Sequence, residues 1–165
     1  MNHDIKTICV VGLGYIGLPT AALLANRGYR VYGVDVVERV VETINRGEIH
    51  IVEPDLDSFV RSAVGTGSLT AHGEAQPADV FVIAVPTPLT DDNAPRMDYV
   101  WDAARMIAPH VRAGNLVILE STSPVGTTER VGHALAESGV DVASIHIAHC
   151  PERVLPGRIM IELSE

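Results

Sequence analysis

The sequence predicts an α/β fold, a doubly wound parallel sheet in a single domain of 165 residues. Two observations predict it. Short apolar, β-branched runs alternate along the chain with segments whose apolar residues recur at helical spacing. Each connection between these runs is long enough for the helical crossover that parallel strands require. The length suits one domain with a real core, and no internal repeat, low-complexity segment or linker divides the sequence.

The first part of the chain predicts two strand–helix pairs. Residues 7–11 (TICVV) are apolar and β-branched, and after a glycine-rich turn the helical spacing i, i+3, i+4, i+7 runs through residues 18–25. A second strand is expected at 30–35. The same helical spacing then runs from Val37 to Ile44, and Gly47 is a plausible helix stop.

The middle of the chain continues the alternation. Residues 56–64 predict a third helix that ends at Gly65, and residues 69–71 predict a short edge strand. The run DVFVIAV at 79–85 is typical of a strand buried on both faces, and Pro86 and Pro88 close it.

The last part repeats the pattern. Residues 100–107 predict a fourth helix, which stops before Pro109, and residues 127–138 predict a fifth. Strands are expected at 116–119 and 144–148. Beyond Pro151 the pattern fades, and residues 159–163 resemble only the beginning of another element.

The composition excludes several classes of protein. Lys and Arg number 12 against 21 Asp and Glu, a formal charge of −9, which argues against a nucleic-acid or anionic-membrane partner. The uncharged stretch 7–26 contains glycines and a proline and changes to helical spacing midway, so we do not interpret it as a signal sequence or a membrane span. The two cysteines, Cys9 and Cys150, form neither a CxxC nor a Cys/His cluster; we expect no disulfide and no metal site, and a cytoplasmic protein.

The strongest motif joins the first strand to the first helix. In Gly12-Leu13-Gly14-Tyr15-Ile16-Gly17, the first glycine permits a tight turn, the second leaves room for a pyrophosphate, and the third lets helix and strand pack closely. The phosphates would meet the helix N-terminus. Asp35, at the end of the second strand, is placed to accept hydrogen bonds from an adenosine ribose. These features predict a Rossmann-type domain that binds a dinucleotide.

Asp35 favours NAD over NADP. A 2′-phosphate about 4 Å from this carboxylate would be repelled by several kcal/mol. Arg39 follows one turn into the next helix. It stacks on adenine or softens that repulsion, or it is simply a solvated helix residue; the sequence does not decide between a functional role and a solvated residue.

Two loops follow strands at the edge where open α/β sheets place ligands. One is Val85-Pro86-Thr87-Pro88, a rigid turn that presents one hydroxyl. The other, residues 120–127, is rich in hydroxyls and leads into a helix. We assign Thr127 to capping that helix, whereas Thr122 lies too far upstream for this role.

A third loop, residues 149–157, follows the last strand. Glu152 is a candidate acid, base or water-orienting group, with an ion pair to Arg153 or Arg158 as the equally supported alternative. His146 and His149 are three residues apart on a strand and point to opposite faces, which disfavours a metal site. Nothing places a base beside Cys150, so we expect a small, mostly buried cysteine rather than a nucleophile.

Together these segments resemble the UDP-glucose/GDP-mannose dehydrogenases, which oxidise the C6 alcohol of a nucleotide sugar to a carboxylate. The resemblance spans nearly the whole chain. Within the family, residues 44–57 and 150–157 look most like the bacterial members that act on UDP-N-acetyl-D-mannosamine for surface polysaccharide synthesis. The resemblance to the family rests on the following segments: GLGYIGLP at 12–19, VD at 34–35, VPTP at 85–88, ESTSPVGTT at 120–128 and CPERVLPG at 150–157.

The resemblance implies roles for individual residues. Thr122 and Glu152 would belong to the catalytic set, placing a water and moving protons. In UDP-glucose dehydrogenases a second glutamate follows four residues after the first; Pro156 stands there in this chain, which agrees with the mannosamine-type interpretation. Arg153, Val154 and Leu155 would contact the sugar nucleotide. The implied NAD-binding residues are Gly12, Gly14, Tyr15, Ile16, Gly17, Asp35, Arg39, Pro86, Thr87 and Thr122.

Family members are longer than this chain. They continue into a central helix and a sugar-binding domain with the nucleophilic cysteine, and that cysteine would carry the aldehyde to a thioester after hydride transfer to NAD. We therefore expect residues 1–165 to be the NAD-binding domain of a larger, dimeric or higher oligomeric enzyme, inactive alone. The alternatives are a dehydrogenase for another sugar nucleotide, UDP-GlcNAc or UDP-glucose, and a non-catalytic NAD-binding regulatory module.

Overall fold

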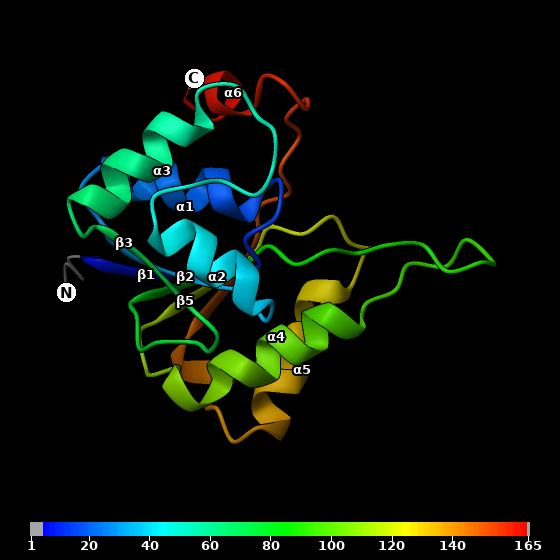
Figure 1. Cartoon of the computed structure of the whole chain (residues 1–165). Coiled ribbons are helices and arrows are strands. Elements are labelled where there is room, and N and C mark those ends of the chain that lie inside the picture. Colours follow the sequence, from blue (N-terminus) through cyan, green and yellow to red (C-terminus); the bar gives the residue numbers. More distant parts are fainter. Residues whose placement is uncertain (1–4, 165) are drawn as a thin grey trace.

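In the computed structural model, which describes residues 5–164, one parallel sheet lies between two layers of helices (Figure 1). The spatial order of the strands is β3-β2-β1-β4-β5-β6, and every neighbouring pair is parallel. Between β1 and β4 the winding changes direction, which creates the switch point where such sheets bind ligands. The strands are β1 Thr7–Val11, β2 Arg30–Val34, β3 Leu69–His72, β4 Val80–Ile83, β5 Leu116–Leu119 and β6 His146–His149.

The helices divide between the two faces of the sheet. α1 packs against α3 and α6 on one face, and α4 packs against α5 on the other (Figure 1). Two short 3-10 helices, η1 Ala108–His110 and η2 Val142–Ser144, extend the second layer. The α-helices are α1 Gly17–Asn26, α2 Glu38–Asn45, α3 Leu56–Gly65, α4 Asp98–Ile107, α5 Thr127–Glu137 and α6 Ile159–Ser164.

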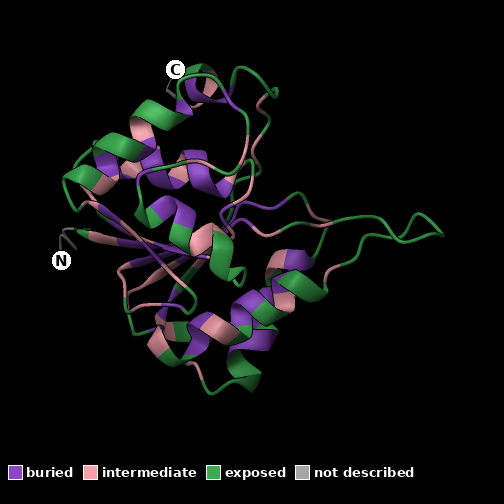
Figure 2. Ribbon diagram, viewed as in Figure 1, coloured by how far each residue is buried: buried purple, intermediate pink, exposed green. Residues whose placement is uncertain are grey.

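The central strands supply both halves of the core by strict alternation. In β1, Ile8 and Val10 belong to the cluster beneath α1 and α3, whereas Cys9 and Val11 belong to the cluster beneath α4 and α5. A strand covered by helices on both faces has no polar side, because successive side chains point to opposite layers. Figure 2 accordingly shows buried residues along the strands and exposed residues on the outer helix faces.

The predicted fold class is confirmed, and the expected elements are present with shifted ends. The strand expected from residue 79 begins at Val80, because the Asp79 carboxylate accepts hydrogen bonds from the amides of Lys6 and Thr7, both at 2.9 Å. The strand expected from residue 144 begins at His146, because η2 takes the preceding residues. Where the sequence pattern faded, α6 forms a short helix.

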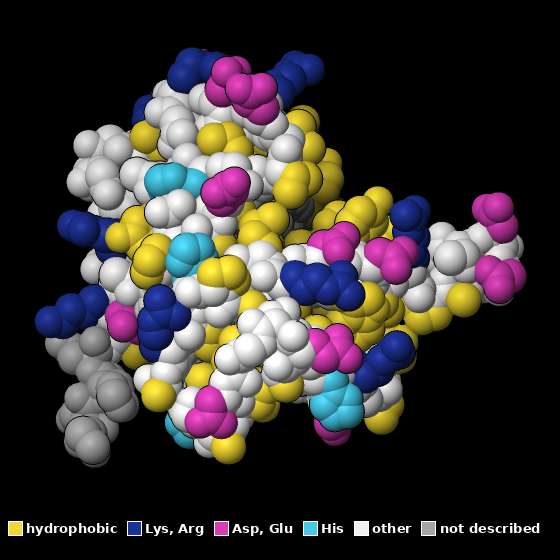
Figure 3. All heavy atoms as spheres, turned by 90° about the horizontal axis from the view of Figure 1, so that it is seen from below, with side chains coloured by type: hydrophobic (Ala, Val, Ile, Leu, Met, Phe, Trp, Pro, Cys, Tyr) yellow, Lys and Arg dark blue, Asp and Glu magenta, His cyan; other side chains and the backbone are white. Residues whose placement is uncertain are grey.

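Residues 86–97 form an arm that projects from the carboxyl edge of the sheet between β4 and α4 (Figure 1). The arm is held by an antiparallel bridge between Leu89 and Pro95 and by the Thr90 amide, which donates to the Ala94 carbonyl at 2.8 Å. Acidic side chains lie at its tip (Figure 3). Leu89 is 65% exposed on this arm.

Of the helices in residues 5–164, none is long and apolar enough to cross a membrane.

Candidate functional site

The glycine-rich turn lies at the carboxyl end of β1, beside the switch point. Gly12 has a φ of +94°, which disfavours side chains, and a Cβ there would lie 2.5 Å from the Ala84 carbonyl oxygen. A Cβ on Gly17 would lie 1.7 Å from the Gly12 carbonyl oxygen, so this glycine is required for the close packing of α1 on the turn. A Cβ on Gly14 would meet nothing within 4 Å. The three glycines therefore divide as the motif predicts: two for the turn and packing, and one facing open space.

The N-terminus of α1 is suited to an anion. No side chain caps the helix at Ile16, and no acidic residue occupies its first turn. The positive end of the helix dipole therefore lies at the turn that bears Gly14, where a Cβ would meet nothing within 4 Å. This arrangement fits the pyrophosphate of a dinucleotide. Tyr15, on the turn, is 51% exposed.

Asp35 fastens the glycine turn to the end of β2. Its Oδ2 accepts a hydrogen bond from the Leu13 amide at 3.1 Å, and its Oδ1 accepts one from the Val37 amide at 2.9 Å. Each carboxylate oxygen has a second lone pair, so both can still accept a ribose hydroxyl. The sequence predicted the ribose role of Asp35 but not its structural role in holding the turn.

His50 is a neighbour of Asp35 that the sequence analysis missed. Burial lowers the pKa of its imidazole, while the Asp35 charge and the Leu13 backbone oppose that shift. The Asp35 carboxylate and the Leu13 backbone therefore both influence the imidazole of His50, which is an exposed residue. No spacing rule links a histidine after α2 to a turn before α1, so the sequence carried no signal for it.

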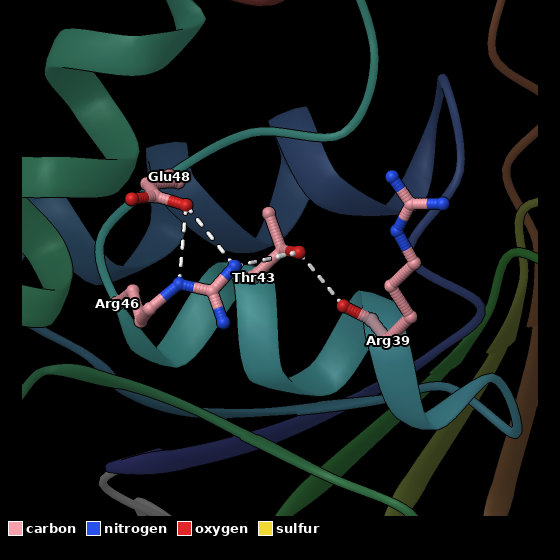
Figure 4. Close-up of polar contacts among 4 residues, drawn as sticks. All are labelled: Arg39, Thr43, Arg46 and Glu48. Atoms are coloured by element: carbon pink, nitrogen blue, oxygen red, sulfur yellow. Dashed lines mark hydrogen bonds and ion pairs between the residues drawn. The ribbon is translucent and has the colours of Figure 1, made fainter.

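Arg39 lies in α2 with its side chain directed away from the polar network of that helix (Figure 4). In this network the Thr43 hydroxyl donates to the Arg39 carbonyl at 2.7 Å, and Arg46 pairs with Glu48 at 3.1 Å. The guanidinium of Arg39 is drawn on the side of the loop that joins β1 to α1. Its position is compatible with the adenine role, which stays a prediction.

The loops after β4 and β5 meet, as their positions at the carboxyl edge require. The Thr87 hydroxyl donates to the Thr122 carbonyl oxygen at 2.8 Å, and the Ser121 hydroxyl donates to the Val85 carbonyl oxygen at 2.8 Å. Thr122 and Pro86 are exposed beside this junction. Two candidate residues predicted from separate motifs, Thr87 and Thr122, are thus adjacent.

The capping role expected of Thr127 is wrong. Gly126, in the left-handed region at φ +87°, occupies the N-cap position of α5 and makes no side-chain cap. The Thr127 hydroxyl instead donates to the Pro124 carbonyl oxygen at 2.7 Å. Because Thr127 is buried inside the first turn, its hydroxyl closes the preceding loop rather than satisfying a helix amide.

The loop after β6 carries Glu152 in a half-buried position. Its Oε1 accepts a hydrogen bond from the Arg153 amide at 2.6 Å. Arg158 pairs with Glu162 at 3.7 Å, and among the described residues no ion pair joins Glu152 to Arg153 or Arg158, so the alternative interpretation of Glu152 as an ion-pair residue is not supported. Arg153 is exposed, Val154 is half-buried and Leu155 is 60% exposed.

Cys150 is exposed, which corrects the expectation of a buried residue. The strand preceding it is the edge strand β6, whose residues are mostly exposed, so an apolar run in the sequence did not imply burial. Cys9, in the central strand β1, is buried, and burial raises the pKa of its thiol to about 11.

Glu53 holds the third loop to the rest of the site, and the sequence analysis assigned it no role. Its side chain is 4% exposed. Oε2 accepts a hydrogen bond from the Gly157 amide and Oε1 one from the Ile159 amide, both at 2.8 Å. The segment before α3 therefore anchors the start of α6 and, through it, the end of the loop that bears Glu152.

Glu120 is a second buried carboxyl group without an assigned role. It lies at the end of β5 and is 8% exposed. Burial raises its pKa to about 7; the hydrogen bond from Thr20 opposes this rise, and the charge of Glu152 adds to it. Thr20, on α1, and Glu120 are far apart in sequence, so only the fold brings them together.

A surface hollow of about 800 Å³ lies at the opposite, amino-terminal edge of the sheet. Its lining includes Lys6, Arg27 and Arg30 but none of the candidate residues. The candidate cofactor site is instead the open carboxyl edge described above. Within residues 5–164, no group of three or more His, Cys, Asp or Glu side chains could hold a metal ion.

The strand order and the glycine turn define the chain as a dinucleotide-binding domain of the Rossmann type, of the kind that dehydrogenases use. The comparison with protein families is more specific. The UDP-glucose/GDP-mannose dehydrogenase family, NAD binding domain, matches residues 6–165, and the chain belongs to this family. Its cofactor is accordingly NAD.

Individual relatives agree with this assignment. The chain is 54% identical to the NDP-N-acetyl-D-galactosaminuronic acid dehydrogenase of Ralstonia nicotianae, covering 100% of the chain and 41% of the relative. It is 57% identical to the UDP-N-acetyl-D-mannosamine dehydrogenase of Yersinia pestis, covering 96% and 40%. A solved UDP-D-ManNAc dehydrogenase from Pyrococcus horikoshii superposes with a TM-score of 0.89 at 41% identity, covering 96% and 39%. The chain thus spans about two fifths of the length of these relatives.

Proposed function

We propose that the full-length protein containing this chain oxidises the C6 alcohol of UDP-N-acetyl-D-mannosamine to a carboxylate, with two NAD, for surface polysaccharide synthesis. One observation carries the proposal. In a chain 57% identical to a UDP-N-acetyl-D-mannosamine dehydrogenase, the glycine turn, Asp35 and the Thr87–Thr122 junction all lie at the carboxyl edge of one sheet. An open edge of this kind is where such sheets bind a dinucleotide.

In this proposal the chain's own residues hold NAD, which when bound supplies the hydride acceptor. The turn around Gly14, with Tyr15 and Ile16, holds the pyrophosphate at the N-terminus of α1. Asp35 accepts the ribose hydroxyls and Arg39 lies against the adenine. The junction of the loops after β4 and β5 lines the nicotinamide end through Pro86, Thr87 and Thr122.

The chemistry assigned to this chain rests on two side chains. The exposed hydroxyl of Thr122 orients a water molecule, and the carboxylate of Glu152 takes up and returns a proton. Arg153, Val154 and Leu155, on the loop that Glu53 anchors, contact the sugar nucleotide. Two observations support this division: the Arg153 amide donates to the Glu152 carboxylate at 2.6 Å, and the Arg153 residue is exposed.

The proposal requires parts of the protein that lie outside this sequence. A second domain would bind the UDP-sugar and supply a nucleophilic cysteine, as the resemblance to the family implies; Cys9 of this chain is buried in the core, where its thiol is a poor nucleophile. The complete enzyme would be a cytoplasmic homodimer or higher oligomer.

One observation favours a second candidate substrate. A relative at 54% identity, matched over the whole chain, is an NDP-N-acetyl-D-galactosaminuronic acid dehydrogenase. Both candidates carry an N-acetylated sugar, and Pro156 stands where UDP-glucose dehydrogenases have a second glutamate. These two observations favour an N-acetylated sugar nucleotide over UDP-glucose as the substrate.

The test is turnover of the full-length protein with NAD and four substrates: UDP-N-acetylmannosamine, UDP-N-acetylgalactosamine, UDP-N-acetylglucosamine and UDP-glucose. We expect the highest kcat/KM with the first and two NADH formed per sugar. Preference for UDP-glucose would contradict the proposed substrate. Absence of turnover with all four sugars, together with intact NAD binding, would favour a non-catalytic NAD-binding module.

A further inference from the structure

Glu120 is a buried ionisable side chain at the candidate site that the proposed function leaves without a task. It follows β5 directly, one residue before Ser121 and two before Thr122. Its amide donates to the Ile83 carbonyl at 2.9 Å, which ties the residue to the end of β4 as well. Glu120 therefore lies under the loop junction rather than on the surface of the site.

The two carboxyl oxygens of Glu120 have unequal surroundings. Oε1 accepts a hydrogen bond from the Thr20 hydroxyl of α1 at 2.9 Å. Oε2 is buried and has no hydrogen-bond partner, and no Lys or Arg of residues 5–164 forms an ion pair with Glu120. One neutral donor is poor compensation for an ionised carboxylate with so little access to water. Protonation converts Oε2 into a hydroxyl donor and removes the charge.

A second carboxyl group acts on Glu120 from the loop after β6. Glu152 is half-buried, and its negative charge, after burial itself, raises the pKa of Glu120. From α1 the group facing Glu120 is the Thr20 hydroxyl, which opposes that rise and does not titrate in this range. When two carboxyl groups interact, the less solvated one is protonated first, so the proton is expected on the buried Glu120.

We propose that Glu120 is a positioning residue: its buried carboxyl group holds a proton in the resting site and so places no second negative charge next to Glu152, the base of the proposed mechanism. The inference rests on the proposed function, because it gives a task to the Glu152 site. No bond is made or broken in the resting state: the proton resides on Glu120, and it passes to solvent when the pH rises above about 7. A second negative charge then lies near Glu152.

The protonation state can be measured without cofactor or sugar. We would record carboxyl infrared spectra of the full-length protein between pH 5 and pH 9 and take the difference from Glu120→Gln. The expected difference is one protonated carboxyl band that disappears around pH 7. In Glu152→Gln the band should disappear at lower pH, and in Thr20→Val at higher pH. Glu129→Gln, on the exposed face of α5, is the matched control and should leave it unchanged.

The positioning role is tested separately by the pH profile of turnover. In the wild type we expect a change of slope near pH 7 that Glu120→Gln removes, and kcat more affected than KM. No protonated band in the wild type at pH 5 to 6, or a band that Glu152→Gln does not move, would overturn the proposal whatever the protein's activity. A normal band with a pH profile unchanged in Glu120→Gln would overturn the positioning role alone. Failure of the proposed substrate would leave the infrared result standing.

Discussion

Replacement of Glu53 by Gln should loosen the start of α6 and the loop that precedes it. Glu53 is buried, and its two oxygens accept hydrogen bonds from the Gly157 and Ile159 amides, both at 2.8 Å. The first-turn amides of a helix have no acceptor within the helix. The protection of the Ile159 amide therefore depends on this one side chain, more than a hundred residues away in the sequence.

The size of the effect follows from the chemistry of the two bonds. A hydrogen bond to a charged group contributes about 1.5 to 3 kcal/mol, and an unsatisfied buried donor costs about 1 to 3 kcal/mol. Glutamine of the same shape keeps one acceptor without its charge and turns the other oxygen into an NH₂ group that faces a donor. We expect a loss of about 3 kcal/mol, which is roughly a 100-fold change in an opening equilibrium.

Amide hydrogen exchange, measured residue by residue, is the direct assay. We expect the protection factor of Ile159 to fall about 100-fold in Glu53→Gln, while amides in β1 and β4 change less. Glu48→Gln is the matched control: it lies in the same segment, is exposed and pairs with Arg46 at the surface, and should have little effect. Protection of Ile159 within about threefold of the wild type in Glu53→Gln would refute the reasoning.

Three further predictions concern the glycine turn, the cofactor and pH. Gly17→Ala places a Cβ 1.7 Å from a carbonyl oxygen and should destabilise the domain by more than about 3 kcal/mol in urea unfolding, whereas Gly14→Ala, with nothing within 4 Å, should cost less than about 1 kcal/mol and yet weaken NAD binding; equal stability of the two variants would contradict the packing argument. Saturating NAD, but not NADP, should raise the melting temperature by about 5 to 10 °C, and Asp35→Asn should reduce this preference; an equal rise with both cofactors would exclude the assigned role of Asp35. Because the folded pKa of Glu120, about 7, exceeds its ordinary value of 4.5, the folded state binds the extra proton between these values, and stability should fall by about 3 kcal/mol as the pH rises through this window; the same decline in Glu120→Gln would assign it to another group.

Much of the fold can be predicted from local sequence patterns. The central strand β1 has apolar residues without interruption from Ile8 to Val11, because helices cover both of its faces. The helices have apolar residues at intervals of three and four. The glycine turn was also predictable, since only glycine satisfies a positive φ at Gly12 and the close approach at Gly17. The adjacency of Thr87 and Thr122 follows from a general rule, because neighbouring parallel strands end at the same edge.

The errors of the sequence analysis have structural causes that the sequence patterns do not show. Thr127 has the composition of a cap, but Gly126 takes the cap position and the threonine hydroxyl donates to Pro124. Cys150 ends an apolar run, but that run lies in an edge strand that has a neighbour on one side only. Burial depends on what covers a strand, and hydropathy along the chain does not record it.

The sequence by itself therefore determined the class of fold, the cofactor loop and the family, all of which depend on residues close together in the chain. The tertiary structure decided which distant side chains meet: Glu53 with the amides that start α6, Thr20 with Glu120, and Glu120 with the charge of Glu152. The reason is physical. Periodicity and turn chemistry are local properties of the backbone, whereas the pKa of a buried carboxyl group and the anchoring of a loop depend on donors and charges that only the packed chain brings within a few ångströms.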